Sequence, residues 1–433
     1  MDFKELSDKA NEYRKNKDYA RAVEYYKKCW DNYRNLCDER IGWGYAYSLR
    51  KLERFNEALD ISREVYKMKP DYELNNNVYA WCIYYTEIKK DKIEDSSTFE
   101  KAAKGILELT KQDNKFSPYM NTIFKVLDYY KDPDFNAKKI LEWTDILSPD
   151  VLSREADHFT SKDGKKRKMA SDLERYYAIR SEALLKLEKY KECIELCNKA
   201  LRTFFEFHYD NDVWFRRRIA NSYSGLGEHD KALELFNSLL QQKKEWFIQK
   251  EISELYFRKQ QYDNALQYAV DAALNTGDWD KKINLYILMA DIFEARNQKE
   301  LAKMHIELVI SIKQQQDWKI KDTDTQQMKK YDIDANQRFD YKKLYNKLRT
   351  EWEKIKFKDR PKVRGVIKKK LPNNKAGFVR ADDGNEYYFS ARELEGKIDN
   401  YKDGDKVSFY IEEGFDKKKG KSSPVATKIK KDK

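Results

Sequence analysis

Two aromatic residues and three lysines near the C-terminus have the side chain types that contact an unpaired nucleic-acid strand. Phe378 and Tyr388 can stack on bases, a contact worth about 1–3 kcal/mol per base. Lys368, Lys370 and Lys375 stand close to them in the sequence, and flexible lysines neutralise backbone phosphates without sequence choice. These five residues are the predicted nucleic-acid-binding site.

The sequence offers no comparable set of residues for catalysis. It has no phosphate-binding glycine loop, no HExxH motif and no GxSxG motif. The five cysteines form no CxxC pair and are expected to be small core residues in a reducing cytoplasm. No catalytic residue, metal ligand or cofactor is therefore predicted, and we do not expect an enzyme. The four histidines are isolated from one another in the sequence: His158, His208, His229 and His305.

The segment that carries the predicted site changes from helical periodicity to two-residue alternation at Lys362. The alternation places Tyr387, Phe389 and Phe409 in a core and leaves Tyr410 able to face outward. Five short strands favour a small closed barrel of the oligonucleotide-binding (OB) type. The predicted strands, separated by turn-forming residues, are 363–369, 376–381, 386–390, 406–412 and 424–430.

Several motifs of this barrel resemble those of the cold-shock domain family. Val363–Lys368 (VRGVIK) looks like the first strand of such a domain, and Lys375–Val379 (KAGFV) like a shortened KGFGFI motif. Glu386–Ser390 (EYYFS) stands where the FVHF motif is expected, and Gly404–Phe409 (GDKVSF) matches the GDxVxF strand. The resemblance covers residues 362–431 and implies binding of single-stranded RNA or DNA with weak sequence preference, with RNA favoured.

The barrel also departs from the cold-shock pattern at three places. Lys369 and Lys370 replace the Trp-Phe pair that usually follows the first strand, the first Phe of KGFGFI is missing, and Ser390 replaces the usual His. Stacking surface is therefore reduced to Phe378 and Tyr388. A barrel that has lost nucleic-acid binding and serves as a further protein-binding module is the alternative hypothesis.

The elements that precede the barrel are repeated helical hairpins. An aromatic residue is followed three positions later by a small residue in each unit, as in Tyr19 with Ala22 and Tyr262 with Ala265. A small residue also recurs about twelve positions earlier, and an apolar or small residue recurs seven positions later. The small residues allow paired helices to approach closely. These spacings are similar to the 34-residue period of tetratricopeptide repeats. The resemblance is good for residues 3–70 and 174–315 and weak for 71–157, and it implies a solenoid that binds a protein or peptide on one face.

Arg217 and Asn221 are the candidate peptide-binding residues of this array. They match the basic residue and Asn, four apart, that open a carboxylate clamp in some tetratricopeptide domains. Glu251 and Ile287 or Leu288 interrupt the pattern further along, and a solvated basic helix face is the interpretation we favour.

The fold class expected from these patterns is multidomain and mainly α, with a helical-hairpin (TPR-like) solenoid followed by a small five-stranded OB-type barrel. A basic segment, which includes Lys162 and Lys165–Lys168, is expected to be an exposed loop, solvated or in contact with phosphates. The expected divisions are TPR-like repeats 1–157, basic loop 158–170, second TPR-like block 171–316, helical linker 317–359 and barrel with basic tail 360–433.

The net charge of +12 is concentrated in the barrel, because residues 360–433 contain 20 Lys or Arg against 12 Asp or Glu. A second lysine cluster, Lys417–Lys419, Lys421, Lys428, Lys430, Lys431 and Lys433, adds to this basic region.

No signal peptide or run of 18 apolar residues is present, so we expect a cytoplasmic protein without membrane contact. The expected activity is that of an adaptor whose solenoid binds a protein, or forms a homodimer, and whose barrel binds nucleic acid. A regulatory sensor is a further alternative.

Overall fold

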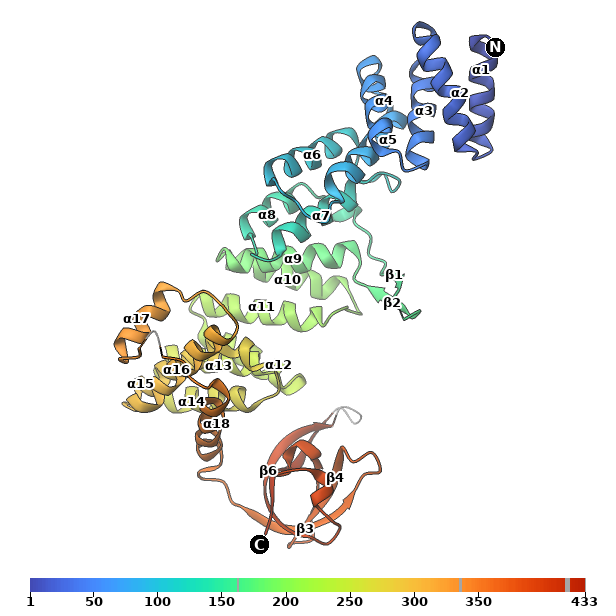
Figure 1. Cartoon of the computed structure of the whole chain (residues 1–433). Helices are drawn as coiled ribbons and strands as arrows, with labels where there is room; N and C mark the ends of the chain where they lie inside the picture. The colour runs from blue at the N-terminus through green and yellow to red at the C-terminus, as the bar shows by residue number, and fades with distance from the viewer. Residues whose placement is uncertain (162, 335–336, 417–420, 433) are drawn as a thin grey trace. The chain divides into compact units, whose positions relative to one another are not determined.

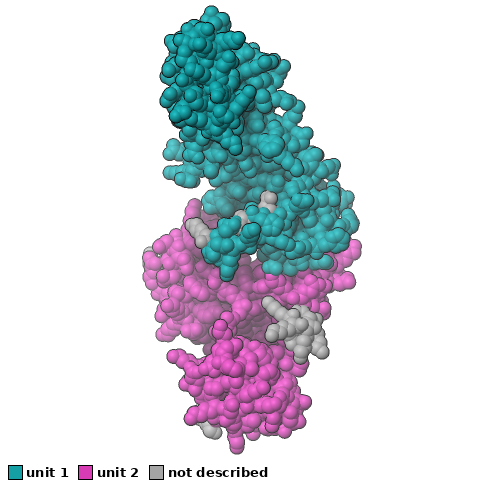
Figure 2. Space-filling view, turned by 90° about the vertical axis from the view of Figure 1, so that its right-hand side faces the viewer, with its two compact units in different colours: residues 1–226 teal, residues 227–433 magenta. Residues whose placement is uncertain are grey.

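The computed structural model describes residues 1–161, 163–334, 337–416 and 421–432. The chain divides into two compact units, residues 1–226 and 227–433, which are coloured separately in Figure 2. The first unit is almost entirely helical, and the second contains helices followed by a β-barrel (Figure 1). The predicted fold class, a TPR-like helical array followed by a five-stranded barrel, is confirmed.

The first unit consists of successive helices and one small hairpin. Its helices are α1 (Phe3–Lys15), α2 (Tyr19–Asn32), α3 (Glu39–Lys51), α4 (Phe55–Met68), α5 (Glu73–Ile83), α6 (Ser96–Leu109), α7 (Tyr119–Lys131), α8 (Ala137–Asp145), α9 (Asp172–Lys186), α10 (Tyr190–Thr203) and α11 (Asn211–Gly225).

The second unit continues with seven helices before the barrel. They are α12 (His229–Gln242), α13 (Trp246–Arg258), α14 (Tyr262–Leu274), α15 (Ile283–Ala295), α16 (Lys299–Gln315), α17 (Asp322–Lys330) and α18 (Tyr341–Phe357).

Small residues hold the helix pairs together, as the repeat pattern predicts. Ala22 and Ala58 of the first unit and Ala265 and Ala302 of the second are completely buried. A larger side chain at these positions would force the paired helices apart, because protein cores are close-packed. All five cysteines are also buried and occur as free thiols.

The corner between the two helices of a pair is built from backbone atoms. At the end of α1, Lys17 has a left-handed φ of 62°, and Asp18 N donates to Tyr13 O at 2.9 Å. This arrangement is the Schellman motif that ends many helices. The same bond closes the corners that contain Glu53, Glu188, Gln260 and Asn297, where φ lies between 57° and 59°.

The segment expected to be a helical linker, 317–359, has two aromatic residues, Trp352 and Tyr345, that suit docking on neighbouring helices, and it packs against the array. Trp352 of α18 is completely buried, and its Nε1 donates to Nε2 of the equally buried His305 on α16 at 3.0 Å. Lys313 at the end of α16 forms a buried ion pair with Asp324 of α17, with both oxygens 2.6 Å from Nζ. The polar sequence between Lys319 and Gln337 does not predict these contacts, because the residues that are buried there include the charged Asp324.

The basic segment expected to be an exposed loop, 158–170, contains most of a two-stranded hairpin. Strands β1 (Asp157–Thr160) and β2 (Lys166–Met169) are antiparallel, with His158 directly opposite Lys168. Ser161 N donates to Lys165 O at 2.9 Å, and Gly164 has a φ of 77°. This turn brings the two strands together, and the sequence shows no alternation of apolar and polar residues that would predict them. Lys162 lies outside the described residues.

The barrel is a closed sheet with strand order β3-β4-β5-β7-β6. Strands β5 and β7 pair in parallel, and β3 closes the sheet by pairing with both β4 and β6. The predicted strands all form, and the last two are longer than predicted. Their bounds are β3 (Val363–Lys370), β4 (Ala376–Ala381), β5 (Glu386–Ser390), β6 (Lys406–Asp416) and β7 (Lys421–Lys431).

Alternate residues of these strands fill the barrel. Phe389 and Phe409 are completely buried and Tyr387 nearly so, as the alternation predicts. Gly365 is required by the close approach of β3 to β4, since a Cβ atom there would lie 2.2 Å from Arg380 O. The other alternate residues of β4 and β5 face the outer surface of the barrel. The pairing register of the two strands determines which of these residues lie side by side in the candidate site.

Candidate nucleic-acid interface

The two predicted stacking residues form one aromatic platform on the outer surface of the barrel. Phe378 of β4 and Tyr388 of β5 are direct cross-strand partners, and their ring centroids lie 5.8 Å apart at an interplanar angle of 74°. Tyr388 is 44% exposed, whereas Phe378 is half-buried. Residues that are directly paired on neighbouring strands project to the same face of the sheet. Both rings therefore point away from Phe389 and the rest of the core.

A β-bulge in β3 decides which lysine lies beside the platform. Between Ile367 and Lys369 the pairing with β4 shifts by one residue, so that Lys369 stands opposite Phe378. Lys369 Nζ lies 5.6 Å from the centre of the Phe378 ring. Lys370 stands opposite Gly377, an inward-facing position of β4. Lys369 is therefore a platform residue that simple alternation does not indicate.

The other two predicted lysines have different surroundings. Lys368 Nζ donates to both oxygens of Glu386 at 2.5 and 2.6 Å, and Arg380 donates to the same carboxylate at 3.2 Å. The hydrogen bond from Lys368, supported by those from Arg380, lowers the pKa of the exposed Glu386 against an opposing effect of desolvation. Lys375 is exposed in the turn between β3 and β4.

The charge that remains without a carboxylate partner lies at one end of the platform. No carboxylate of the described residues lies within 4 Å of Lys369, Lys370 or Lys375. The tail lysines of the second predicted cluster are paired instead: Lys428 with Glu353, Lys430 with Glu395 at 3.3 Å, and Lys431 with Asp405 at 2.7 Å. Lys417–Lys419 and Lys433, and the side chain of Lys421, lie outside the described residues.

Tyr410 does not extend the platform. Its ring stacks on that of Phe357 at the end of α18, with centroids 4.3 Å apart and an interplanar angle of 21°. Next to it, Lys356 forms ion pairs with Asp271 at 3.2 Å and Glu412 at 2.9 Å. This side of the barrel faces α18, which leaves Phe378 and Tyr388 as the aromatic pair open to a ligand.

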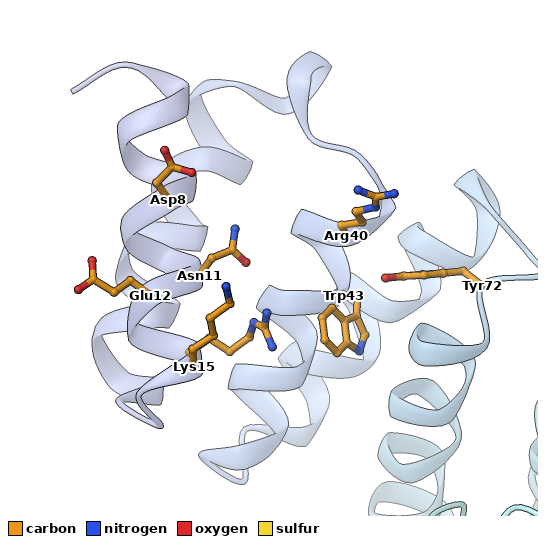
Figure 3. Close-up of a pocket in the computed structure, with 8 residues that line it drawn as sticks. Asp8, Asn11, Glu12, Lys15, Arg40, Trp43 and Tyr72 are labelled. Carbon is orange, nitrogen blue, oxygen red and sulfur yellow. The ribbon is translucent and has the colours of Figure 1, made fainter.

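The helical array has a cavity of its own near the N-terminus. It measures about 500 Å³ and lies between α1 and α3. Asn11 and Lys15 project from α1 toward the side that carries Arg40 and Trp43, as Figure 3 shows. The Arg14 guanidinium stacks on Trp43, 4.6 Å from the ring centre. The lining also includes the carboxylates of Asp8 and Glu12, so the cavity presents both signs of charge beside its aromatic rings.

The candidate peptide-binding residues Arg217 and Asn221 lie one turn apart on α11, and both are half-buried. The Arg217 guanidinium lies 5.2 Å from the ring centre of Trp214 on the same helix.

Within the described part of the chain, no group of three or more His, Cys, Asp or Glu side chains could hold a metal ion. No described helix has the length and apolar character needed to cross a bilayer.

Two family models match parts of the chain. A tetratricopeptide repeat model matches residues 6–33, which cover most of α1 and α2. A family described as a domain of unknown function, DUF7017, matches residues 213–351 and ends before the barrel. No curated protein matches the sequence.

Solved structures with similar helical repeats share little sequence with this chain. A tetratricopeptide repeat protein from Parabacteroides merdae is 14% identical, with a TM-score of 0.32 over 76% of this chain and 97% of its own. The human IFIT1 dimer with PPP-AAAA is 15% identical, with a TM-score of 0.37 over 81% and 77%. The TPR2AB-domain:pHSP90 complex of yeast Sti1 is 9% identical, with a TM-score of 0.28 over 69% and 98%. Such values describe the repeat fold and carry no conclusion about ligands.

Proposed function

We propose that the chain is a non-enzymatic adaptor whose barrel binds single-stranded nucleic acid while its helical array binds a protein. The observation that carries the proposal is the exposed Tyr388–Phe378 platform with Lys369 beside it and Lys375 in the turn that leads into β4, both without a carboxylate partner among the described residues. Bases stack on such rings without strong sequence preference, and ammonium groups neutralise the phosphates between them.

The topology of the barrel supports this assignment. Proteins of the OB type bind oligonucleotides on the second and third strands and on the adjoining loops. Here the second and third strands of the barrel are β4 and β5, which carry Phe378 and Tyr388, and Lys375 lies in the loop that leads into β4. RNA is favoured over DNA as the ligand only by the motifs similar to those of cold-shock domains.

The aromatic pair is expected to supply most of the affinity for a strand. The double replacement Phe378→Ala with Tyr388→Ala in the full chain should weaken binding of a labelled single-stranded RNA at least tenfold, because each stacked base contributes about 1–3 kcal/mol. Fluorescence anisotropy at low salt measures the change. Phe116→Ala removes a highly exposed aromatic ring of the helical array and is the control, with unchanged affinity expected. No binding by the unaltered chain at low salt would contradict the proposal.

The lysines are expected to determine the salt dependence. Replacing Lys369 and Lys375 by glutamine should reduce the slope of log K against log salt by about 0.7 for each phosphate contact removed. Titrations between about 50 and 200 mM salt give this slope. Lys430→Gln, which removes an amine already paired with Glu395, should leave the slope unchanged. Equal effects of the two changes would mean that the platform does not position the strand.

A protein scaffold whose barrel binds no nucleic acid is the second candidate, favoured by the Glu386 carboxylate on the same surface as the platform. Material that co-purifies with the full chain distinguishes the two. Ultraviolet absorbance typical of nucleic acid that disappears after nuclease treatment supports the first function. Protein partners alone, with no strand binding at low salt, support the second.

A further inference from the structure

We propose that a cavity in the first unit, between the basic hairpin and the loop that joins α10 to α11, binds a single nucleotide. This site is separate from the barrel and goes beyond the function proposed for it. The cavity measures about 600 Å³, within the range of small-molecule pockets. It is lined by residues 154–156, by His158, Lys168, Ser171 and Glu174, and by the loop residues 203–206 and 208.

The basic wall of the cavity is formed by the hairpin and the segment that leads into it. His158 and Lys168 are direct cross-strand partners, so their side chains share one face of the hairpin. Lys166, two residues before Lys168, lies on the same face. Arg154 adds a guanidinium from the preceding segment. These donors suit a phosphate group.

The opposite wall presents a phenylalanine to solvent. Phe205 is fully exposed, although its neighbours Phe204 and Phe207 are packed. Phe204 contacts Tyr177 and Phe207, and Phe207 contacts Phe215, with ring centroids 5.8–6.3 Å apart. The loop is thus held by its aromatic neighbours while one ring projects outward, an arrangement that suits stacking on a base.

The floor of the cavity is a buried carboxylate that holds the loop in place. Glu174 is 1% exposed and accepts hydrogen bonds from His208 N, His208 Nδ1 and Asn211 Nδ2, each at 2.8 Å. Because the carboxylate can only accept, the proton lies on Nδ1 of His208. Its Nε2 atom is buried and has no hydrogen-bond partner among the described residues.

The cavity also contains two carboxylates that a simple anion site would lack. Glu206 is 3.4 Å from Lys168 and largely exposed, and Glu155 lies beside Arg154 in the lining. An inorganic anion would be repelled by both. A nucleotide fits the mixture better, since its phosphate meets the cations, its base meets Phe205, and base amino groups donate to carboxylates.

Calorimetry on the full chain with ribonucleoside monophosphates and with inorganic phosphate tests this site. At least one nucleotide should bind about tenfold more tightly than phosphate, because base stacking adds about 1–3 kcal/mol. Phe205→Ala and Lys168→Gln should each weaken that binding about tenfold. Phe116→Ala, a second highly exposed phenylalanine of the same unit, is the matched control.

The outcomes separate this site from the barrel. Binding that survives Phe378→Ala with Tyr388→Ala but is lost in Phe205→Ala supports the cavity whatever the barrel does. Absence of nucleotide binding, phosphate binding of equal strength, or loss only in the barrel variant overturns it. Competition by an oligonucleotide with a terminal phosphate would identify the ligand as the end of a strand, and lack of competition would identify it as a free nucleotide.

Discussion

Replacing Trp352 with alanine is expected to lower the free energy of unfolding of residues 227–433 by about 4 kcal/mol. The indole is completely buried, stacks on Tyr286 with ring centroids 5.8 Å apart, and meets the edge of Tyr345. Its removal leaves a large cavity in the core between α15, α16 and α18. It also leaves His305 Nε2 buried without its hydrogen-bond donor, which adds a penalty for the unsatisfied group.

Urea unfolding followed by circular dichroism measures this loss. Trp318→Ala is the matched control, since Trp318 is 44% exposed and its replacement should change the free energy by less than about 0.5 kcal/mol. If the two variants unfold at the same urea concentration, α18 is not part of the core of the second unit. The barrel would then be joined to the array by a mobile segment.

Acid is expected to weaken the same core through His305. Burial lowers the pKa of His305 from 6.5 to about 4, and the hydrogen bond to Leu301 O opposes the change. The unfolded chain therefore binds a proton more tightly than the folded chain between these two values. Stability rises with pH across this window and is lost as the pH falls from about 6.5 toward 4, by about 3 kcal/mol in total for this group.

The contribution of His305 can be separated from that of the many carboxylates that titrate in the same range. His305→Gln keeps an acceptor for Trp352 Nε1 and cannot be protonated. The difference in unfolding free energy between pH 6.5 and 4 should therefore be smaller in this variant than in the unaltered chain. Identical pH profiles would show that His305 does not couple protonation to folding.

Much of the fold follows from local sequence pattern. Small residues at fixed spacing identify the helix pairs, and two-residue alternation identifies the five strands, because each pattern reports which face of an element is buried. The docking of α18 was only partly foreseeable. Trp352 and Tyr345 indicate a helix that packs, but the partner His305 is 47 residues away and lies on a different helix.

The candidate site shows the same limit on a smaller scale. In a regular strand Lys368 and Lys370 would lie on the same face of β3, because they are two residues apart. The bulge after Ile367 adds one residue, so Lys369 takes the place beside Phe378. The ion pairs of the barrel also cannot be predicted from composition. Lys368 pairs with Glu386, and the tail lysines pair with carboxylates that are distant in the sequence. The aromatic pair itself was predictable, since β4 and β5 are short and regular.

The Schellman corners explain how such an array can diverge in sequence. Each corner is closed by backbone N–H and C=O groups, and the residue in the left-handed conformation is Lys17, Glu53, Glu188, Gln260 or Asn297, with no glycine among these five. A turn that depends on no particular side chain places little constraint on which residue occupies it. The tetratricopeptide repeat model matches residues 6–33, yet the same corner geometry recurs in helix pairs that this model does not match.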